Sequence, residues 1–222
     1  GTMAKSPTEV LAISKNANFG PFTGQLLVGE MNKPRIVRVM LEEVGGELQG
    51  ACVPFIDGSP LGRGCNRMAW APDGSLFVGQ TKHTWAGGQG IQQVLWNGKT
   101  PFEIQNMELT KKGFKFTFTQ PVDKKFALQK ENWPFKRYFF EYRKDYGSPR
   151  SDEKSVAISK IEISGNGKIV ELALSELTPW HIHEVNIQNI KAQNGAPLTN
   201  GYIAYTLNRL LGETPPEPLQ IK

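Results

Sequence analysis

The feature that most constrains the fold of this chain is the alternation of apolar and polar residues in short runs that end at glycine, proline, asparagine or aspartate. Phe114, Phe116 and Phe118 share one face of such a run, and Lys115 and Thr117 share the other. A period of two is typical of a half-buried β-strand, because successive side chains point to opposite faces. The 23 glycines and 15 prolines supply many turn positions. The pattern predicts an all-β protein.

Residues 1–100 contain short β-branched or aromatic runs joined by hairpin-type turns. The most informative stretch is Met68–Gly79, in which the turn Pro72-Asp73-Gly74 separates two apolar runs. Proline sets φ in such a turn and glycine accepts a positive φ. A strand, this turn and a second strand ending in glycine form the beginning of a β-propeller blade. A similar shape at 19–29 starts about 50 residues upstream, close to one blade period.

From Pro101 onward the runs are longer and amphipathic, with looser connections. About seven such runs, with hairpin turns of the Asn-Gly type, are typical of an immunoglobulin-like sandwich. One of them, at 156–163, is expected to form a single strand. We therefore predict partial propeller-like blades packed with a sandwich. The expected parts are a propeller-blade-like region at 1–100, an Ig-like β-sandwich at 101–211 and a proline-rich tail at 212–222.

The charge and hydropathy patterns argue against two classes of partner. The net charge of +5 and the pI of about 9.1 favour acidic partners in general. Lysine and arginine are nevertheless scattered among glutamate and aspartate rather than gathered in one stripe, so we do not expect nucleic-acid binding. No run of about 18 apolar residues occurs, so we expect no membrane span.

The two cysteines, Cys52 and Cys65, form neither a CxxC nor a CxxCH pattern. Their spacing excludes a covalently attached c-type haem and a cysteine zinc site within this chain. Two alternatives stay open: a disulfide between them if the protein is exported, or two separate buried thiols.

His181 and His183 form a His-x-His pair on a predicted strand. This spacing puts both imidazoles on one face and suits a metal ion. The same face continues through Val185 and Ile187, so structural histidines in the core are the alternative. His83 completes a three-histidine set only if the two halves of the chain fold onto each other.

Several aromatic residues are candidates for ligand contact. The glycine-rich segment 81–90 carries His83 and Trp85, and we interpret it either as a ligand-contacting loop or as a connector. Trp133 and Tyr142, in the loop-rich part of the second half, are candidates for a sugar-stacking platform, because flat apolar rings suit the C–H faces of pyranoses. No complete catalytic constellation is visible in the sequence.

Seven phrases of the sequence, read together, resemble one protein family. The phrases are Phe19–Glu30, Val37–Glu43, Gln49–Phe55, Ala71–Thr81, Leu95–Ile104, Phe116–Asp123 and Tyr205–Asn208. The family comprises large secreted bacterial proteins related to the glucose/sorbosone dehydrogenases, six-bladed propellers that bind pyrroloquinoline quinone. The resemblance implies the end of a propeller and the Ig-like module that follows it. It also implies a periplasmic or extracellular location, with the signal peptide outside this sequence.

The resemblance further bears on cofactors and partners. Residues 1–100 supply only about two blades, so pyrroloquinoline quinone and Ca²⁺ are expected only where a full propeller is present. Arg63 and Arg67 are of the residue type that would hold a polycarboxylate quinone, and surface roles are the alternative. The implied partners are other domains of the parent protein, including a c-type cytochrome. Self-association through uncovered blade edges is a further expectation.

The leading functional hypothesis is a non-catalytic ancillary or interaction module of a secreted multidomain protein linked to sugar oxidation. One alternative is a fragment of a quinone-dependent sugar dehydrogenase. Another is a free-standing glycan-binding protein.

Overall fold

The computed structural model describes residues 3–83, 86–145 and 147–214. Strands account for 52% of the chain and helices for 3%, which confirms the all-β prediction. The strands are β1 (Pro7–Ala12), β2 (Leu26–Glu30), β3 (Arg35–Val44), β4 (Glu47–Asp57), β5 (Cys65–Trp70), β6 (Leu76–His83), β7 (Ala86–Val94), β8 (Ile104–Thr110), β9 (Gly113–Phe118), β10 (Phe135–Phe140), β11 (Arg150–Val156), β12 (Ile158–Ile163), β13 (Ile169–Leu174), β14 (His181–Asn186) and β15 (Tyr202–Leu207). The helical turns are α1 (Lys124–Ala127) and η1 (Lys130–Asn132). Among the described residues, no helix is long and apolar enough to cross a membrane.

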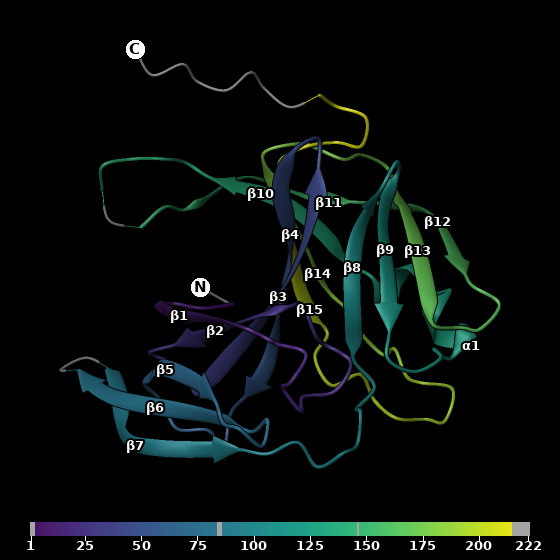
Figure 1. Ribbon diagram of the computed structural model, residues 1–222. Coiled ribbons are helices and arrows are strands. Elements are labelled where there is room, and N and C mark those ends of the chain that lie inside the picture. Colours follow the sequence, from purple (N-terminus) through teal and green to yellow (C-terminus); the bar gives the residue numbers. More distant parts are fainter. Residues whose placement is uncertain (1–2, 84–85, 146, 215–222) are drawn as a thin grey trace.

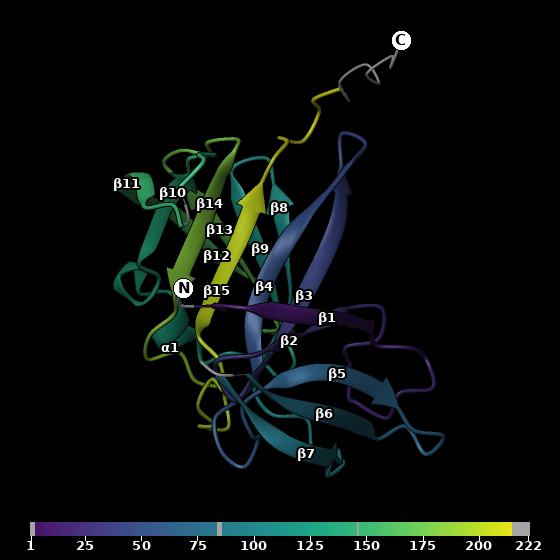
Figure 2. The same ribbon diagram turned by 90° about the vertical axis from the view of Figure 1, so that its left-hand side faces the viewer.

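The strands form three antiparallel sheets, none of them closed. Their orders are β1-β2-β3-β4-β15-β14-β10-β11, β12-β13-β9-β8 and β5-β6-β7. Figure 1 shows the three-stranded sheet at the bottom, below β1 and β2, and the four-stranded sheet at the right. Figure 2 shows β1 running across the β3–β4 hairpin, so the largest sheet is strongly twisted.

The largest sheet takes strands from both halves of the chain. β4 pairs with β15, with Cys52 opposite Ala204 and Gly50 opposite Thr206. The expected boundary at residue 100 therefore separates two segments that contribute to one sheet. The run expected as a single strand at 156–163 is instead divided at Ala157, because β11 ends the eight-stranded sheet and β12 begins the four-stranded one.

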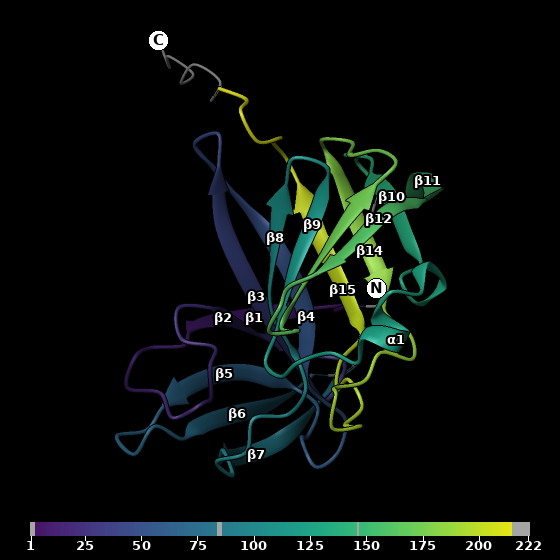
Figure 3. The ribbon, with the colours of Figure 1, turned by 90° about the vertical axis from the view of Figure 1, so that its right-hand side faces the viewer.

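The larger core lies between the four-stranded sheet and the part of the eight-stranded sheet formed by β4, β15, β14 and β10 (Figure 3). Phe114, Phe116 and Phe118 are all 0% exposed, as the period of two predicts. The ring of Phe114 stacks on that of Phe135 from the opposite sheet, with centroids 5.9 Å apart. These aromatic contacts hold the two layers together.

A second, smaller core packs β5 and β6 against the first strands of the eight-stranded sheet. The Pro72-Asp73-Gly74 turn joins β5 to β6, and Gly74 has a φ of +80°. The Asp73 carboxylate accepts a hydrogen bond from the Ser75 amide at 2.9 Å, which closes the turn. The sheet is also fastened to β1, because the Thr8 hydroxyl donates to the Cys65 carbonyl at 2.7 Å.

A buried arginine connects the two cores. Arg38 of β3 is 0% exposed, and its guanidinium donates to the main-chain carbonyls of Ile104 and Gln105 in β8. It also donates to Gln25 Oε1 at 2.6 Å and lies 4.2 Å from the ring centroid of Phe22. Burial lowers the pKa of Arg38 to about 10, so the group stays charged at neutral pH.

Glu103 lies beside this arginine and is 1% exposed. One carboxylate oxygen accepts from the Ile104 amide at 2.9 Å and the other from the Asn200 side chain at 2.7 Å. Burial raises the pKa of Glu103 to about 7, and the charge of Arg38 acts in the opposite direction.

We expect the Glu103→Gln variant to lack one component of the pH dependence of stability. The folded pKa of about 7 lies above the ordinary value of 4.5, so the folded state holds the proton more tightly. The stabilisation from Glu103 is therefore complete below pH 4.5 and is lost as the pH rises to 7. The free energy of unfolding of the variant, relative to wild type, should rise by about 3 kcal/mol from pH 4.5 to pH 8. Urea unfolding at both pH values measures this difference, and an unchanged difference contradicts the assignment.

Candidate functional site

A hollow of about 640 Å³ lies at one end of three adjacent strands of the eight-stranded sheet. β10 ends there, β14 begins there and β15 ends there, because these neighbours are antiparallel. Its lining combines aromatic and polar side chains: Phe139, Phe140, Glu141, Tyr142, Trp180, His181, Ile182, Thr206 and Asn208.

Three aromatic rings of this lining face solvent. Phe140 is 51% exposed, Trp180 is 62% exposed and Tyr142 is fully exposed. Large aromatic side chains usually bury most of their surface, so three exposed rings around one hollow are a feature that folding alone does not explain. We call Phe140, Tyr142 and Trp180 the aromatic platform.

Trp180 has an unusual backbone conformation. Its φ is +62°, a region that bulky residues rarely adopt and that costs about 1–3 kcal/mol. The Trp180 amide donates to the Leu207 carbonyl at 2.6 Å, which holds this conformation at the start of β14. The guanidinium of Arg209 lies 5.4 Å from the indole centroid and covers part of the ring. The backbone of Trp180 is therefore held by the sheet, and Arg209 contacts its indole beside the hollow.

A buried polar network supports Phe140 from behind. Tyr138 packs edge-on against Phe140, with centroids 5.4 Å apart, and its hydroxyl donates to Glu184 at 3.0 Å. Arg150 donates two hydrogen bonds to the same carboxylate, each 2.8 Å long, and the Tyr202 hydroxyl donates a fourth at 2.7 Å. Burial acts to raise the pKa of Glu184, but these hydrogen bonds outweigh it and lower the pKa. The carboxylate therefore stays ionised and the network stays intact.

Polar groups stand beside the rings. Glu141 accepts from the Ser151 hydroxyl at 3.0 Å, and the hydroxyl of Thr206 and the amide of Asn208 line the same hollow. His181 Nδ1 lies 2.9 Å from the Pro179 carbonyl oxygen. Flat apolar faces next to hydrogen-bonding groups are chemically complementary to a sugar, because a sugar ring has apolar C–H faces and hydroxyl groups at its edges.

The two histidines of the His-x-His pair have different surroundings. His183 is 0% exposed, its ring centroid lies 5.7 Å from that of Phe114, and burial lowers its pKa to about 4. His181 packs edge-on against Phe139 at 5.3 Å and lines the hollow. No group of three or more histidine, cysteine or acidic residues that could hold a metal occurs in the described ranges. The side chain of His83, the third expected member, lies outside the description.

Trp133 is not part of the platform, which corrects the prediction for this residue. It is 1% exposed, its indole nitrogen donates to the Ala127 carbonyl at 2.9 Å, and its ring packs on Phe116. A ring without a free face cannot stack on a sugar. Tyr142 is fully exposed, and Trp180 rather than Trp133 lines the hollow with it. The sequence signal for Trp180 is its position directly before the predicted strand at 181–187, outside any apolar run.

The two cysteines are free thiols in the structure, which corrects the disulfide alternative. Cys52 lies in β4 of the eight-stranded sheet, and Cys65 begins β5 of the three-stranded sheet. Burial raises the pKa of each thiol to about 11, so neither is reactive at neutral pH.

The two predicted arginines lie away from the aromatic platform. Arg63 is exposed in the connection between β4 and β5. Arg67 is exposed on β5 and donates to the Asn66 carbonyl at 2.9 Å. Neither lines the hollow, and Trp85 lies outside the described residues.

Comparisons of the chain with protein-family models, with curated proteins and with solved structures give no match. The functional conclusion therefore depends on the geometry of the site.

Proposed function

We propose that this chain is a non-catalytic interaction module that contacts glycans through the aromatic platform. The observation that carries the proposal is the gathering of Phe140, Tyr142 and Trp180, all largely exposed, around one hollow. Stacking a sugar ring on these side chains removes apolar surface from water on both partners. Glu141, Thr206 and Asn208 supply hydrogen-bonding groups for the hydroxyls.

The platform suits binding because it is held rigidly before any ligand arrives. Sheet hydrogen bonding and Arg209 fix Trp180, and the Tyr138–Glu184–Arg150 network supports Phe140. A preorganised site loses little conformational entropy on association.

The wider setting is also a proposal. The hairpin of β5 and β6 with its Pro-Asp-Gly turn supports a propeller-blade-like interpretation of the three-stranded sheet, and the two packed antiparallel sheets support an Ig-like interpretation of the second half. We propose that the module belongs to a secreted bacterial multidomain protein linked to sugar oxidation, located in the periplasm or outside the cell. Other domains of that protein, including a c-type cytochrome, are its proposed partners.

The platform is tested by the Trp180→Ala variant in affinity gel electrophoresis against a panel of polysaccharides. We expect at least one polysaccharide to retard the wild type, and the variant to bind it about tenfold more weakly, which corresponds to about 1.4 kcal/mol. Phe77→Ala is the matched control, because Phe77 is 38% exposed on β6 and does not line the hollow.

Two results would count against the platform: no retardation of the wild type by any polysaccharide, or equal retardation of the Trp180→Ala and Phe77→Ala variants. Differential scanning fluorimetry with pyrroloquinoline quinone and Ca²⁺ distinguishes a fragment of a quinone-dependent sugar dehydrogenase from a glycan-binding module. A thermal shift with the quinone and none with polysaccharides favours that alternative.

A further inference from the structure

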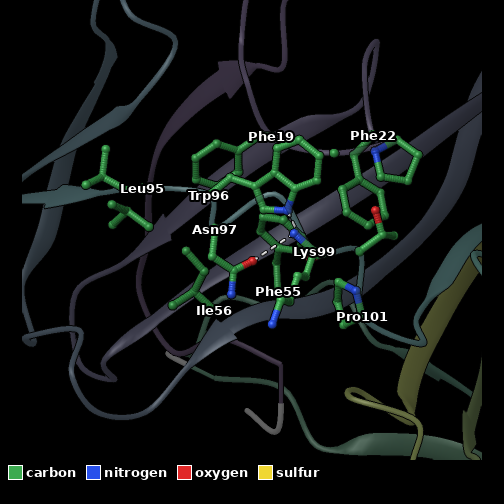
Figure 4. Close-up of a pocket in the computed structure, with 13 residues that line it drawn as sticks. Phe19, Phe22, Phe55, Ile56, Leu95, Trp96, Asn97, Lys99 and Pro101 are labelled. Carbon is green, nitrogen blue, oxygen red and sulfur yellow. Dashed lines mark hydrogen bonds between the residues drawn. The ribbon is translucent and has the colours of Figure 1, made fainter. Parts of the chain in front are cut away.

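A second hollow, of about 300 Å³, lies where the two halves of the chain meet. Its walls come from the loop at 19–22, from β4 and from the segment 94–101 that leads from β7 to β8. Figure 4 shows Phe19, Phe22 and Phe55 together with Trp96 around this hollow. The volume lies at the lower end of the range for small-molecule sites.

The aromatic walls are already packed in place. The rings of Phe22 and Phe55 meet edge-on with centroids 5.2 Å apart, and Phe19 lies 6.1 Å from Phe55. On the other side, the indole nitrogen of Trp96 donates to the Lys99 carbonyl at 3.1 Å. The Lys99 amide in turn donates to Asn97 Oδ1 at 3.0 Å, so a turn holds the Trp96 ring (Figure 4). A flat ligand therefore meets a prepared apolar slot.

The lining of this hollow carries a single charge, which is positive. Lys99 is the one ionisable side chain in the lining, and no carboxylate lines it. The Lys99 ammonium group has no hydrogen-bond or ion-pair partner in the described part of the chain, so it is free to contact a ligand. Behind the wall, the buried guanidinium of Arg38 lies 4.2 Å from the Phe22 centroid, and its charge interacts with that of Glu103, so Lys99 is the charge available to a ligand. The hollow is thus complementary to an anion that carries an apolar body.

We propose that this hollow binds a small planar apolar anion, such as an aromatic carboxylate or sulfonate. The ring system lies among Phe22, Phe55 and Trp96, and the acidic group pairs with the ammonium of Lys99. This site is separate from the aromatic platform and does not depend on glycan binding.

Two fluorescent probes with closely similar aromatic rings test the proposal. 1-Anilinonaphthalene-8-sulfonate carries the anion, and N-phenyl-1-naphthylamine lacks it. We expect Lys99→Met to weaken binding of the sulfonate about threefold to fivefold, the range of a partly exposed ion pair, and to leave the neutral probe unaffected. Asn97→Asp keeps the oxygen that accepts from the Lys99 amide and adds a negative charge, so it should have the same selective effect.

Lys168→Met, which removes an exposed lysine elsewhere, is the matched control and should change neither affinity. Trp180→Ala identifies the site, because sulfonate binding that disappears in this variant belongs to the aromatic platform and overturns the proposal. Equal sulfonate affinity in wild type, Lys99→Met and Asn97→Asp overturns it as well. Lys99, Asn97 and Lys168 are all exposed, so their substitution changes little buried surface. Unfolding curves verify the fold of every variant.

Discussion

Replacing Arg38 by methionine lowers the free energy of unfolding by about 3–5 kcal/mol, the cost of removing one partner from a buried charged network. The guanidinium satisfies the carbonyls of Ile104 and Gln105 and the side chain of Gln25, and methionine can satisfy none of them. Each buried acceptor left without a donor adds to the loss. Methionine keeps an unbranched apolar stem of similar length, so the effect isolates the charge and its hydrogen bonds.

The Arg38→Met effect should depend on pH. The charge of Arg38 lowers the pKa of the buried Glu103, so its removal raises that pKa further. The variant should therefore lose more stability at pH 8, where Glu103 must be ionised without its cation, than at pH 5. Urea unfolding at both pH values measures this difference.

Arg67→Met is the matched control for Arg38→Met, because Arg67 is exposed on β5. Its free energy of unfolding should stay within about 0.5 kcal/mol of wild type, as for most surface substitutions. A similar small effect for Arg38→Met would show that the buried guanidinium does not connect the two cores.

The second large effect concerns His183. Burial lowers its pKa to about 4 from an ordinary value of 6.5, so the unfolded chain takes up the proton first as the pH falls. The wild type should lose about 3 kcal/mol of stability from this group between pH 6.5 and pH 4. The His183→Leu variant lacks this loss, so its free energy of unfolding relative to wild type should rise across that window.

The neighbours of His183 make the measurement specific. The charges of His181 and Arg137 disfavour its protonation, and that of Glu176 favours it, but burial is the largest cause. Glu103→Gln provides a control of opposite sign, because between pH 4.5 and 6.5 acidification adds the stabilisation from Glu103 and removes that from His183. If His183→Leu and wild type have parallel stability profiles from pH 7 to pH 4, His183 is not buried as a neutral group.

The two hollows differ in what they can contact. The aromatic platform lies at an end of the eight-stranded sheet, and the hollow beside it also has polar side chains, among them the acidic Glu141. The smaller hollow lies at the junction of the two cores, is mainly aromatic, and has a single positive charge in its lining. Substitutions in one should leave ligand binding in the other unchanged.

The sequence by itself determined the all-β class, the inward face of Phe114, Phe116 and Phe118, and the Pro72-Asp73-Gly74 hairpin. These features depend on a period of two and on local turn chemistry, which neighbouring residues specify. A local pattern did not determine the break in the run at 156–163, because the pattern continues through Ala157, where the chain passes from one sheet to the other.

Only the tertiary structure decided which strands are neighbours and therefore which aromatic rings are covered. The pairing of β4 with β15, the bonds from Arg38 to β8 and the contrast between buried Trp133 and exposed Trp180 all depend on residues far apart in the chain. A local pattern shows that a side chain has a buried or an exposed face, but the partner that covers it is set by strand order and register. For this reason the sequence indicated an aromatic platform, but only the fold determined that Trp180, and not Trp133, belongs to it.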